Sequence, residues 1–176
     1  MTTEQNPPVN LSDSFKAYDV RGIVGKTITT ESVRAVGAAF VDVLGLTGQT
    51  VLVGGDMRPS SAEFSQAFAD GASLRGANVK LLGLVSTDEL YFASGVLKAA
   101  GVVFAASHNP AEYNGVKFCL PGAAPVSSAT LEAIRDQALG ELRPEVPEPG
   151  RYRRIDVLNG YAEHLRSLVD LSGVRR

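Results

Sequence analysis

The sequence has little cysteine, little excess charge and no long apolar run, and each shortage excludes a class of protein. Cys119 is the single cysteine among 176 residues, so no disulfide can form within the chain. With 17 Lys and Arg against 19 Asp and Glu, the net charge is −2, whereas a nucleic-acid binder would carry a basic excess. No stretch approaches the roughly 20 apolar residues of a membrane span. We therefore expect no nucleic-acid partner and no membrane.

Targeting signals and two common catalytic patterns are also missing. The polar stretch from Met1 to Ser14 lacks the apolar core of a signal peptide, so we expect a cytoplasmic protein. The phosphate-binding pattern Gly-x-x-x-x-Gly-Lys-Ser/Thr does not occur, and Gly22, Gly25 and Lys26 are too loosely arranged to replace it. The Gly-x-Ser-x-Gly elbow of many hydrolases does not occur either.

Cys119 itself lies between apolar residues, Phe118 and Leu120. A reactive thiol would need basic neighbours, and no basic cluster surrounds it in the sequence. The pattern therefore favours a small buried side chain over a nucleophile or redox group.

What the chain does have is an alternation of strand and helix patterns. Continuous apolar runs such as Thr50–Val53 are typical of buried strands, whereas Val33, Val36 and Phe40 follow the spacing of a helix. Strands are expected at 15–20, 50–53, 79–85, 101–106 and 115–120, and helices at 30–44, 59–75, 86–97 and 127–139. This alternation predicts an α/β fold, a layered α/β/α domain with a mixed, mostly parallel sheet covered by helices.

The composition changes after residue 140. Pro144, Pro147 and Pro149 lie among charged residues without apolar periodicity, which is typical of a linker. An apolar stripe at helical spacing follows, from Val157 to Leu168. The predicted division is a disordered leader (1–14), the α/β domain (15–140), a Pro-rich linker (141–153) and the truncated first helix of a second domain (154–176).

The most unusual segment, Ser107-His108-Asn109-Pro110, directly follows the apolar run that ends at Ala106. Ligands of open α/β sheets bind at the carboxyl ends of the strands, so a hydroxyl, an imidazole and an amide there form a candidate site. A plain turn begun by Asn-Pro is an alternative. A Ser-His hydrolase is a third interpretation, because a serine nucleophile needs a nearby base. It is weakened because adjacent side chains rarely point at one another.

Three motifs, in order, resemble those of the α-D-phosphohexomutase family. Residues 106–110 (Ala-Ser-His-Asn-Pro) and 113–117 (Tyr-Asn-Gly-Val-Lys) resemble its active-serine loop. Residues 15–22 (Phe-Lys-Ala-Tyr-Asp-Val-Arg-Gly) resemble its N-terminal signature, in the form closer to the phosphomannomutase/phosphoglucomutase branch. Residues 55–61 (Gly-Asp-Met-Arg-Pro-Ser-Ser) resemble its second-strand turn. The resemblance covers residues 15–140, the family's first domain.

The resemblance implies an isomerase of the phosphotransferase type, which interconverts hexose 1-phosphate and hexose 6-phosphate. Ser107 would carry a phosphoryl group and donate it to mannose or glucose phosphate. Glucose or mannose 1,6-bisphosphate would be the intermediate and activator. A Mg²⁺ ion would bind a phosphate oxygen on Ser107 and reduce the cost of its charge.

The resemblance also assigns roles to residues near the serine. Arg21 and Lys117 would offset phosphate charge, and His108 would orient the reactants or transfer a proton. These three residues would bind substrate together with Tyr18 and Asn109. Each has a structural alternative: Arg21 could end a strand, Lys117 could point to solvent, and Tyr18 could pack.

Two charged segments are interpreted structurally. Asp56 and Arg58 are expected to form an ion pair at the start of a helix rather than to take part in catalysis. Asp88 and Glu89 follow Ser86, which predicts a capping box and first-turn carboxylates favoured by the helix dipole.

Several family features lie outside this sequence. The Asp-x-Asp-x-Asp loop that would hold Mg²⁺ belongs to the second domain, and the sequence contains no such spacing. The sugar-selecting and phosphate-binding loops of later domains are missing as well. We therefore expect an N-terminal fragment that is inactive alone. The alternative is a non-catalytic module that binds phosphorylated sugars or associates with itself through exposed apolar surface.

Overall fold

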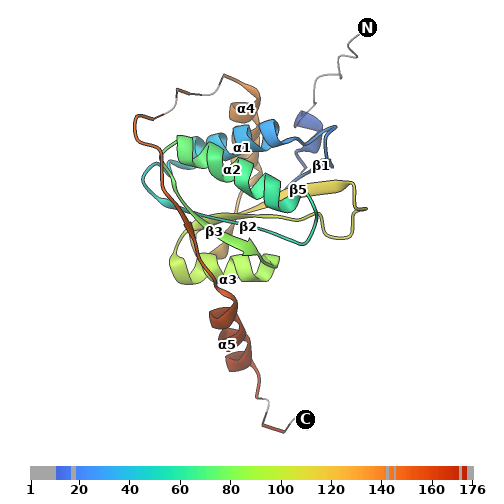
Figure 1. The fold of residues 1–176 in the computed structure, drawn as a ribbon, viewed down its shortest axis with the longest axis vertical. Coiled ribbons are helices and arrows are strands. Elements are labelled where there is room, and N and C mark those ends of the chain that lie inside the picture. Colours follow the sequence, from blue (N-terminus) through green and yellow to red (C-terminus); the bar gives the residue numbers. More distant parts are fainter. Residues whose placement is uncertain (1–10, 17–18, 142, 145, 171, 174–176) are drawn as a thin grey trace.

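The computed structural model describes residues 11–16, 19–141, 143–144, 146–170 and 172–173. Its elements alternate along the chain as the sequence predicts, and Figure 1 shows helices on both faces of a sheet. In chain order they are η1 (Leu11–Ser14), β1 (Val20–Ile23), α1 (Thr30–Leu44), β2 (Thr50–Gly55), α2 (Ser61–Leu74), β3 (Asn78–Leu84), α3 (Thr87–Leu97), β4 (Ala100–Phe104), β5 (Tyr113–Leu120), η2 (Pro121–Ala123), β6 (Ala124–Pro125), α4 (Ser128–Leu139), β7 (Tyr152–Arg154) and α5 (Leu158–Leu168).

The sheet is mixed, which confirms the predicted fold class. Its strands follow the order β1-β5-β4-β2-β3-β7, with the short β6 beside β5. β2 pairs in parallel with β3 and β4, and β3 pairs in parallel with β7. β5 instead runs antiparallel to β1, β4 and β6. The parallel strands β2 and β4 therefore end at the same edge, where the loops after Gly55 and Phe104 become neighbours.

One face of the sheet is covered by α1, α2 and α4 (Figure 1). Its core contains the rings of Phe40, Phe64, Phe68 and Phe104, and the centroids of Phe40 and Phe68 are 5.6 Å apart. α1 and α2 approach closely because each presents a glycine to the other's backbone. A Cβ at Gly37 would collide with the carbonyl of Phe68, and one at Gly71 with that of Arg34.

The other face is covered mainly by α3 (Figure 1). Its core is aliphatic and smaller, with Leu52, Leu90, Val103 and Cys119 among its buried members. The predicted buried state of Cys119 is confirmed, since the side chain is 1 % exposed.

Capping residues in the sequence determine where the helices begin. Thr29 caps α1 and Ser86 caps α3, each in a reciprocal capping box with the residue three positions on. α1 ends at Gly45, whose φ of 64° is the left-handed conformation that glycine adopts most easily. The predicted capping box of Ser86 and Glu89 is therefore confirmed.

Three expected segments differ from the structure. Leu11–Ser14 forms η1 with Leu11 and Ser14 buried, so the leader of 1–14 ends earlier than expected, and residues 1–10 lie outside the described residues. The first strand is β1, Val20–Ile23, rather than 15–20, because its pairing is set by β5. The Pro-rich segment contributes β7 to the sheet edge. The division into domains stays a prediction.

α5 follows β7 and points away from the sheet in Figure 1. None of its residues is buried, and it touches the domain through Phe92 of α3, whose ring lies 5.7 Å from Tyr161 and 5.3 Å from His164. In the part of the chain that the structure describes, no helix is both long enough and apolar enough to cross a membrane.

Candidate active site

Ser107 lies just beyond the carboxyl end of β4, on an exposed loop that leads to β5. Its φ of 51° is in the left-handed region, where a residue other than glycine costs of order 1–3 kcal/mol. Such a conformation persists only where the surrounding structure holds it. The candidate nucleophile therefore stands on a constrained loop at the sheet edge where ligands of α/β folds bind.

His108 places its ring beside the serine hydroxyl, with Ser107 Oγ and His108 Nδ1 3.1 Å apart. The expectation that adjacent side chains would not point at one another is wrong here, because the left-handed backbone at Ser107 removes the usual alternation. Among the described residues no carboxylate hydrogen-bonds the His108 ring. The third group of a hydrolase triad is therefore missing from this part of the chain.

Arg21 and Lys117 line the same cavity as Ser107, which has a volume of about 490 Å³. Arg21 lies on β1 and the half-buried Lys117 on β5, its antiparallel neighbour. Arg21 forms an ion pair with Asp19 at 2.7 Å, while its buried Nε has no hydrogen-bond partner among the described residues. The Lys117 side chain forms no hydrogen bond or ion pair with the described residues. The cavity thus offers cationic donors to an anion beside Ser107.

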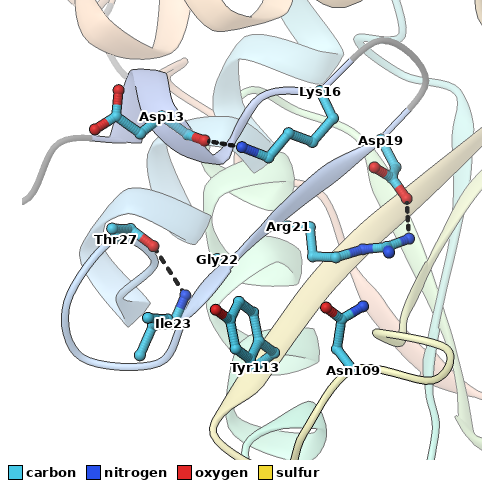
Figure 2. A pocket seen from close by; sticks show the side chains of 9 residues that line it. All are labelled: Asp13, Lys16, Asp19, Arg21, Gly22, Ile23, Thr27, Asn109 and Tyr113. Carbon is cyan, nitrogen blue, oxygen red and sulfur yellow. Dashed lines mark hydrogen bonds and ion pairs between the residues drawn. The ribbon is translucent and has the colours of Figure 1, made fainter.

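Asn109 uses its side chain within the loop. Its Nδ2 donates to the carbonyl of Ala106 at 2.8 Å, and its backbone N–H donates to the same oxygen at 3.0 Å. The predicted Asn-Pro turn is therefore present as local structure. Figure 2 shows Asn109 and Tyr113 below Arg21, in a second cavity of about 630 Å³. Tyr18, the remaining predicted substrate contact, lies outside the described residues.

Arg58 is the residue whose role at the loop the sequence interpretation missed. The expected ion pair with Asp56 is present, with Nε and Oδ2 3.4 Å apart. In addition, its Nη1 donates to the carbonyls of Pro110 and Tyr113, and its Nη2 to those of Ser107 and Asn109. The position of Arg58 after β2 becomes informative only once β2 is known to be the parallel neighbour of β4, the strand before Ser107.

A buried polar network joins β5 to the start of α2. Asn114 is fully buried, and its Nδ2 donates to Ser60 Oγ at 2.8 Å and to Ser61 Oγ at 3.0 Å. Its Oδ1 accepts from the Gly115 N–H at 2.8 Å, and Ser61 Oγ donates to Asp56 Oδ1 at 2.6 Å. Buried polar groups satisfied in this way fix the geometry of their backbone. The loop that carries Ser107 therefore returns to the sheet at a fixed point.

Cys119 and Tyr91 lie on the wall of the Ser107 cavity. Burial raises the pKa of the Cys119 thiol, and burial followed by the nearby Cys119 and Asp88 raises the pKa of the Tyr91 phenol. Both groups stay protonated at neutral pH. They therefore contribute neutral groups to the cavity that Arg21 and Lys117 also line.

A magnesium site is not completed by the described residues. No group of three or more His, Cys, Asp and Glu side chains gathers among them. A hard cation such as Mg²⁺ prefers several oxygen ligands. The described part of the chain therefore does not fit a complete site for this ion.

The fold and the site together define a class: layered α/β domains with a serine-centred, cation-lined site at the carboxyl edge of the sheet. Residues 12–143 match the family model for phosphoglucomutase/phosphomannomutase, alpha/beta/alpha domain I. The chain belongs to this family, the α-D-phosphohexomutases, and contains its N-terminal domain, which confirms the resemblance drawn from the motifs.

Relatives agree in sequence and in structure. A phosphomannomutase of Vibrio cholerae is 37% identical over 162 residues, covering 88% of this chain and 35% of that protein. A phosphomannomutase of Escherichia coli is 36% identical over 166 residues, covering 91% and 36%. The crystal structure of a phosphoglucomutase/phosphomannomutase family protein from Burkholderia thailandensis superposes with a TM-score of 0.81 at 33% identity, covering 90% and 36%. The chain thus spans about a third of the length of these relatives.

Proposed function

We propose that this chain supplies the phosphoserine of a phosphohexomutase that interconverts hexose 1-phosphate and hexose 6-phosphate. The observation that carries the proposal is the arrangement around Ser107. An exposed hydroxyl lies 3.1 Å from a histidine nitrogen and shares its cavity with Arg21 and Lys117. Phosphoryl transfer depends on positioning and on neutralising charge, and these groups provide both.

In the proposed step, the bond between phosphorus and Ser107 Oγ breaks as a bond to a sugar hydroxyl oxygen forms. The proton of that hydroxyl passes to the nitrogen of His108, which returns it to the departing Ser107 oxygen, so that Ser107 leaves as a neutral hydroxyl. The product is a hexose 1,6-bisphosphate. After it turns over, its other phosphate returns to Ser107, so the enzyme is regenerated. Arg21 and Lys117 stabilise the charge on the transferred group.

The remaining requirements are proposed to lie elsewhere in the protein. We propose that a phosphate oxygen on Ser107 is one Mg²⁺ ligand and that the others come from residues outside the described part. Mannose or glucose phosphates are the proposed substrates, because the relatives that match are phosphomannomutases. The isolated chain is expected to be inactive alone. The cytoplasmic location stays a prediction.

The intact mass of the full-length protein after incubation with glucose 1,6-bisphosphate tests this function. The chain should gain one phosphoryl group that maps to Ser107, and the Ser107→Ala variant should gain none. Ser128→Ala, which removes an exposed serine from α4, is the matched control and should behave as the parent. In the full-length protein, Ser107→Ala should lose nearly all mutase turnover. Retained turnover in that variant would contradict the assignment.

A non-catalytic, self-associating module is the second candidate, and exposed apolar residues favour it. Leu158, Leu165 and Leu168 on α5 are 57%, 44% and 65% exposed, and such surface promotes association. Size-exclusion chromatography separates the two candidates. A concentration-dependent dimer that Leu165→Ser abolishes, in a chain that accepts no phosphate, would favour this module. A monomer phosphorylated on Ser107 would exclude it.

A further inference from the structure

Both terminal nitrogens of the Arg58 guanidinium donate to the backbone of the serine loop. Its Nη1 donates to Pro110 O at 2.8 Å and to Tyr113 O at 2.9 Å. Its Nη2 donates to Asn109 O at 2.7 Å and to Ser107 O at 3.2 Å. Its Nε faces Asp56 at 3.4 Å. We propose that Arg58 is a positioning residue that holds the loop in the shape that presents Ser107 Oγ, an inference that rests on the proposed function of Ser107.

The geometry separates this role from substrate binding. A guanidinium carries five N–H donors in a fixed plane. Here four are directed at carbonyls of one loop and the fifth faces a carboxylate, so none remains for a sugar phosphate. Arg21 differs, since its Nε has no partner among the described residues. The two arginines therefore have different roles: Arg58 shapes the loop and Arg21 faces the cavity.

The loop needs such a support because its carbonyls converge. Four carbonyl oxygens between Ser107 and Tyr113 turn inward to one point, and oxygens brought together in this way repel unless a cation lies between them. Inside the loop, two further backbone hydrogen bonds form turns, and their acceptors are the carbonyls of Ala106 and Pro110. Arg58 thus holds the left-handed backbone of Ser107, with φ 51°, through the Ser107 carbonyl.

Arg58 is itself anchored to the sheet. Asp56 Oδ1 accepts the backbone N–H of Arg58 at 2.9 Å and the hydroxyl of Ser61 at 2.6 Å. The backbone N–H of Asp56 donates to Phe104 O at 2.8 Å, which ties the end of β2 to the end of β4. A continuous chain of contacts therefore leads from the central strands through Asp56 and Arg58 to the loop.

The experiment compares Arg58→Ala and Arg58→Lys with Arg75→Ala in the full-length protein. Arg75 is a matched control at the other end of α2: it is buried, pairs with Asp42 at 2.8 Å and donates to the carbonyls of Arg143 and Pro144. The readouts are amide hydrogen exchange of residues 106–113, the phosphorus NMR signal of phosphorylated Ser107, and kcat separately from KM.

Both Arg58 variants should exchange faster at 106–113 and broaden or shift the phosphoserine signal. Their kcat should fall by about 100-fold with KM little changed, the usual cost of misplacing a reacting group by about 1 Å. Lysine should not rescue, because a point charge cannot reproduce a planar fork, whereas added methylguanidinium should partly restore Arg58→Ala. Arg75→Ala should lower thermal stability and leave the loop exchange, the phosphorus signal and kcat unchanged.

Two outcomes would overturn the inference. One is an Arg58→Ala protein whose loop exchange and kcat match those of Arg75→Ala. The other is full activity in Arg58→Lys with parental loop exchange; that variant also decides the matter if Arg58→Ala does not fold. Retained turnover in Ser107→Ala would instead refute the proposed function, and the exchange comparison would still decide whether Arg58 holds the loop.

Discussion

The two faces of the sheet are built differently. Under α1, α2 and α4 the core contains five buried phenylalanine rings, including Phe40 and Phe68, and two helices that approach through Gly37 and Gly71. Under α3 the core is smaller and aliphatic. The second face also borders the Ser107 cavity through Tyr91 and Cys119. The larger core therefore lies on one face, and the Ser107 cavity opens beside the other face, here called the thin face.

The largest effect should come from the aromatic face. Phe68 is fully buried and contacts the rings of Phe40 and Phe104. Phe68→Ala should lower the free energy of unfolding by about 3–5 kcal/mol, because a large cavity forms between two close helices. Phe92→Ala, on the α3 face with ring contacts to Tyr161 and His164, should cost about 1 kcal/mol. Urea unfolding measures both, and equal losses would erase the distinction between the faces.

The aliphatic face should tolerate a cavity better. Leu90 is fully buried against Gly101 and Leu52. Leu90→Ala should cost about 2–3 kcal/mol, the low end for such a substitution, because the single helix α3 can shift toward the space. Thermal and urea unfolding are the measurements. A loss larger than that of Phe68→Ala would show that the thin face contributes more to the free energy of unfolding than the aromatic face.

A smaller effect depends on pH. Burial raises the pKa of the Cys119 thiol above its usual value, so the unfolded chain releases this proton at lower pH than the folded one. The resulting stability is present below the unfolded pKa of about 8.5 and is lost as the pH rises through the folded pKa. Between about pH 7.5 and about pH 9.5, the parent should lose more stability than Cys119→Ala. Parallel pH profiles would contradict this expectation.

The smallest effect should come from α5. Leu168 is 65% exposed and the helix buries no residue. Leu168→Ser should change the unfolding free energy by less than about 0.5 kcal/mol, as exposed substitutions do. Thermal unfolding at low protein concentration is the measurement. A marked loss of stability would mean that α5 supports the thin face more than its burial shows.

The helices were predictable because their signals are local. Thr29 with Ser32, Ser86 with Glu89, and Gly45 mark the ends of α1 and α3 within a few residues of sequence. β7 was not predictable, since Tyr152–Arg154 has no apolar alternation and its pairing with Val79–Leu81 joins residues far apart in the chain.

At the site, the motifs indicated Ser107, Arg21 and Lys117, and the structure brings these three to one cavity. Arg58 was recognised only as a partner of Asp56. Its hydrogen bonds reach Ser107, Asn109 and beyond, about fifty positions along the chain, and no local pattern encodes such contacts. The order β4-β2 in the sheet had to be known first.

β7 has a consequence for how copies of the protein meet in a crowded solution. Within the described residues no strand pairs with its outer side, so a row of free backbone groups faces the solvent. Such an edge can recruit strands from other chains and start aggregation. Here it is only three residues long and carries Arg153 and Arg154, both exposed. Like charges on approaching copies repel, which opposes the pairing of strands from two copies at this edge.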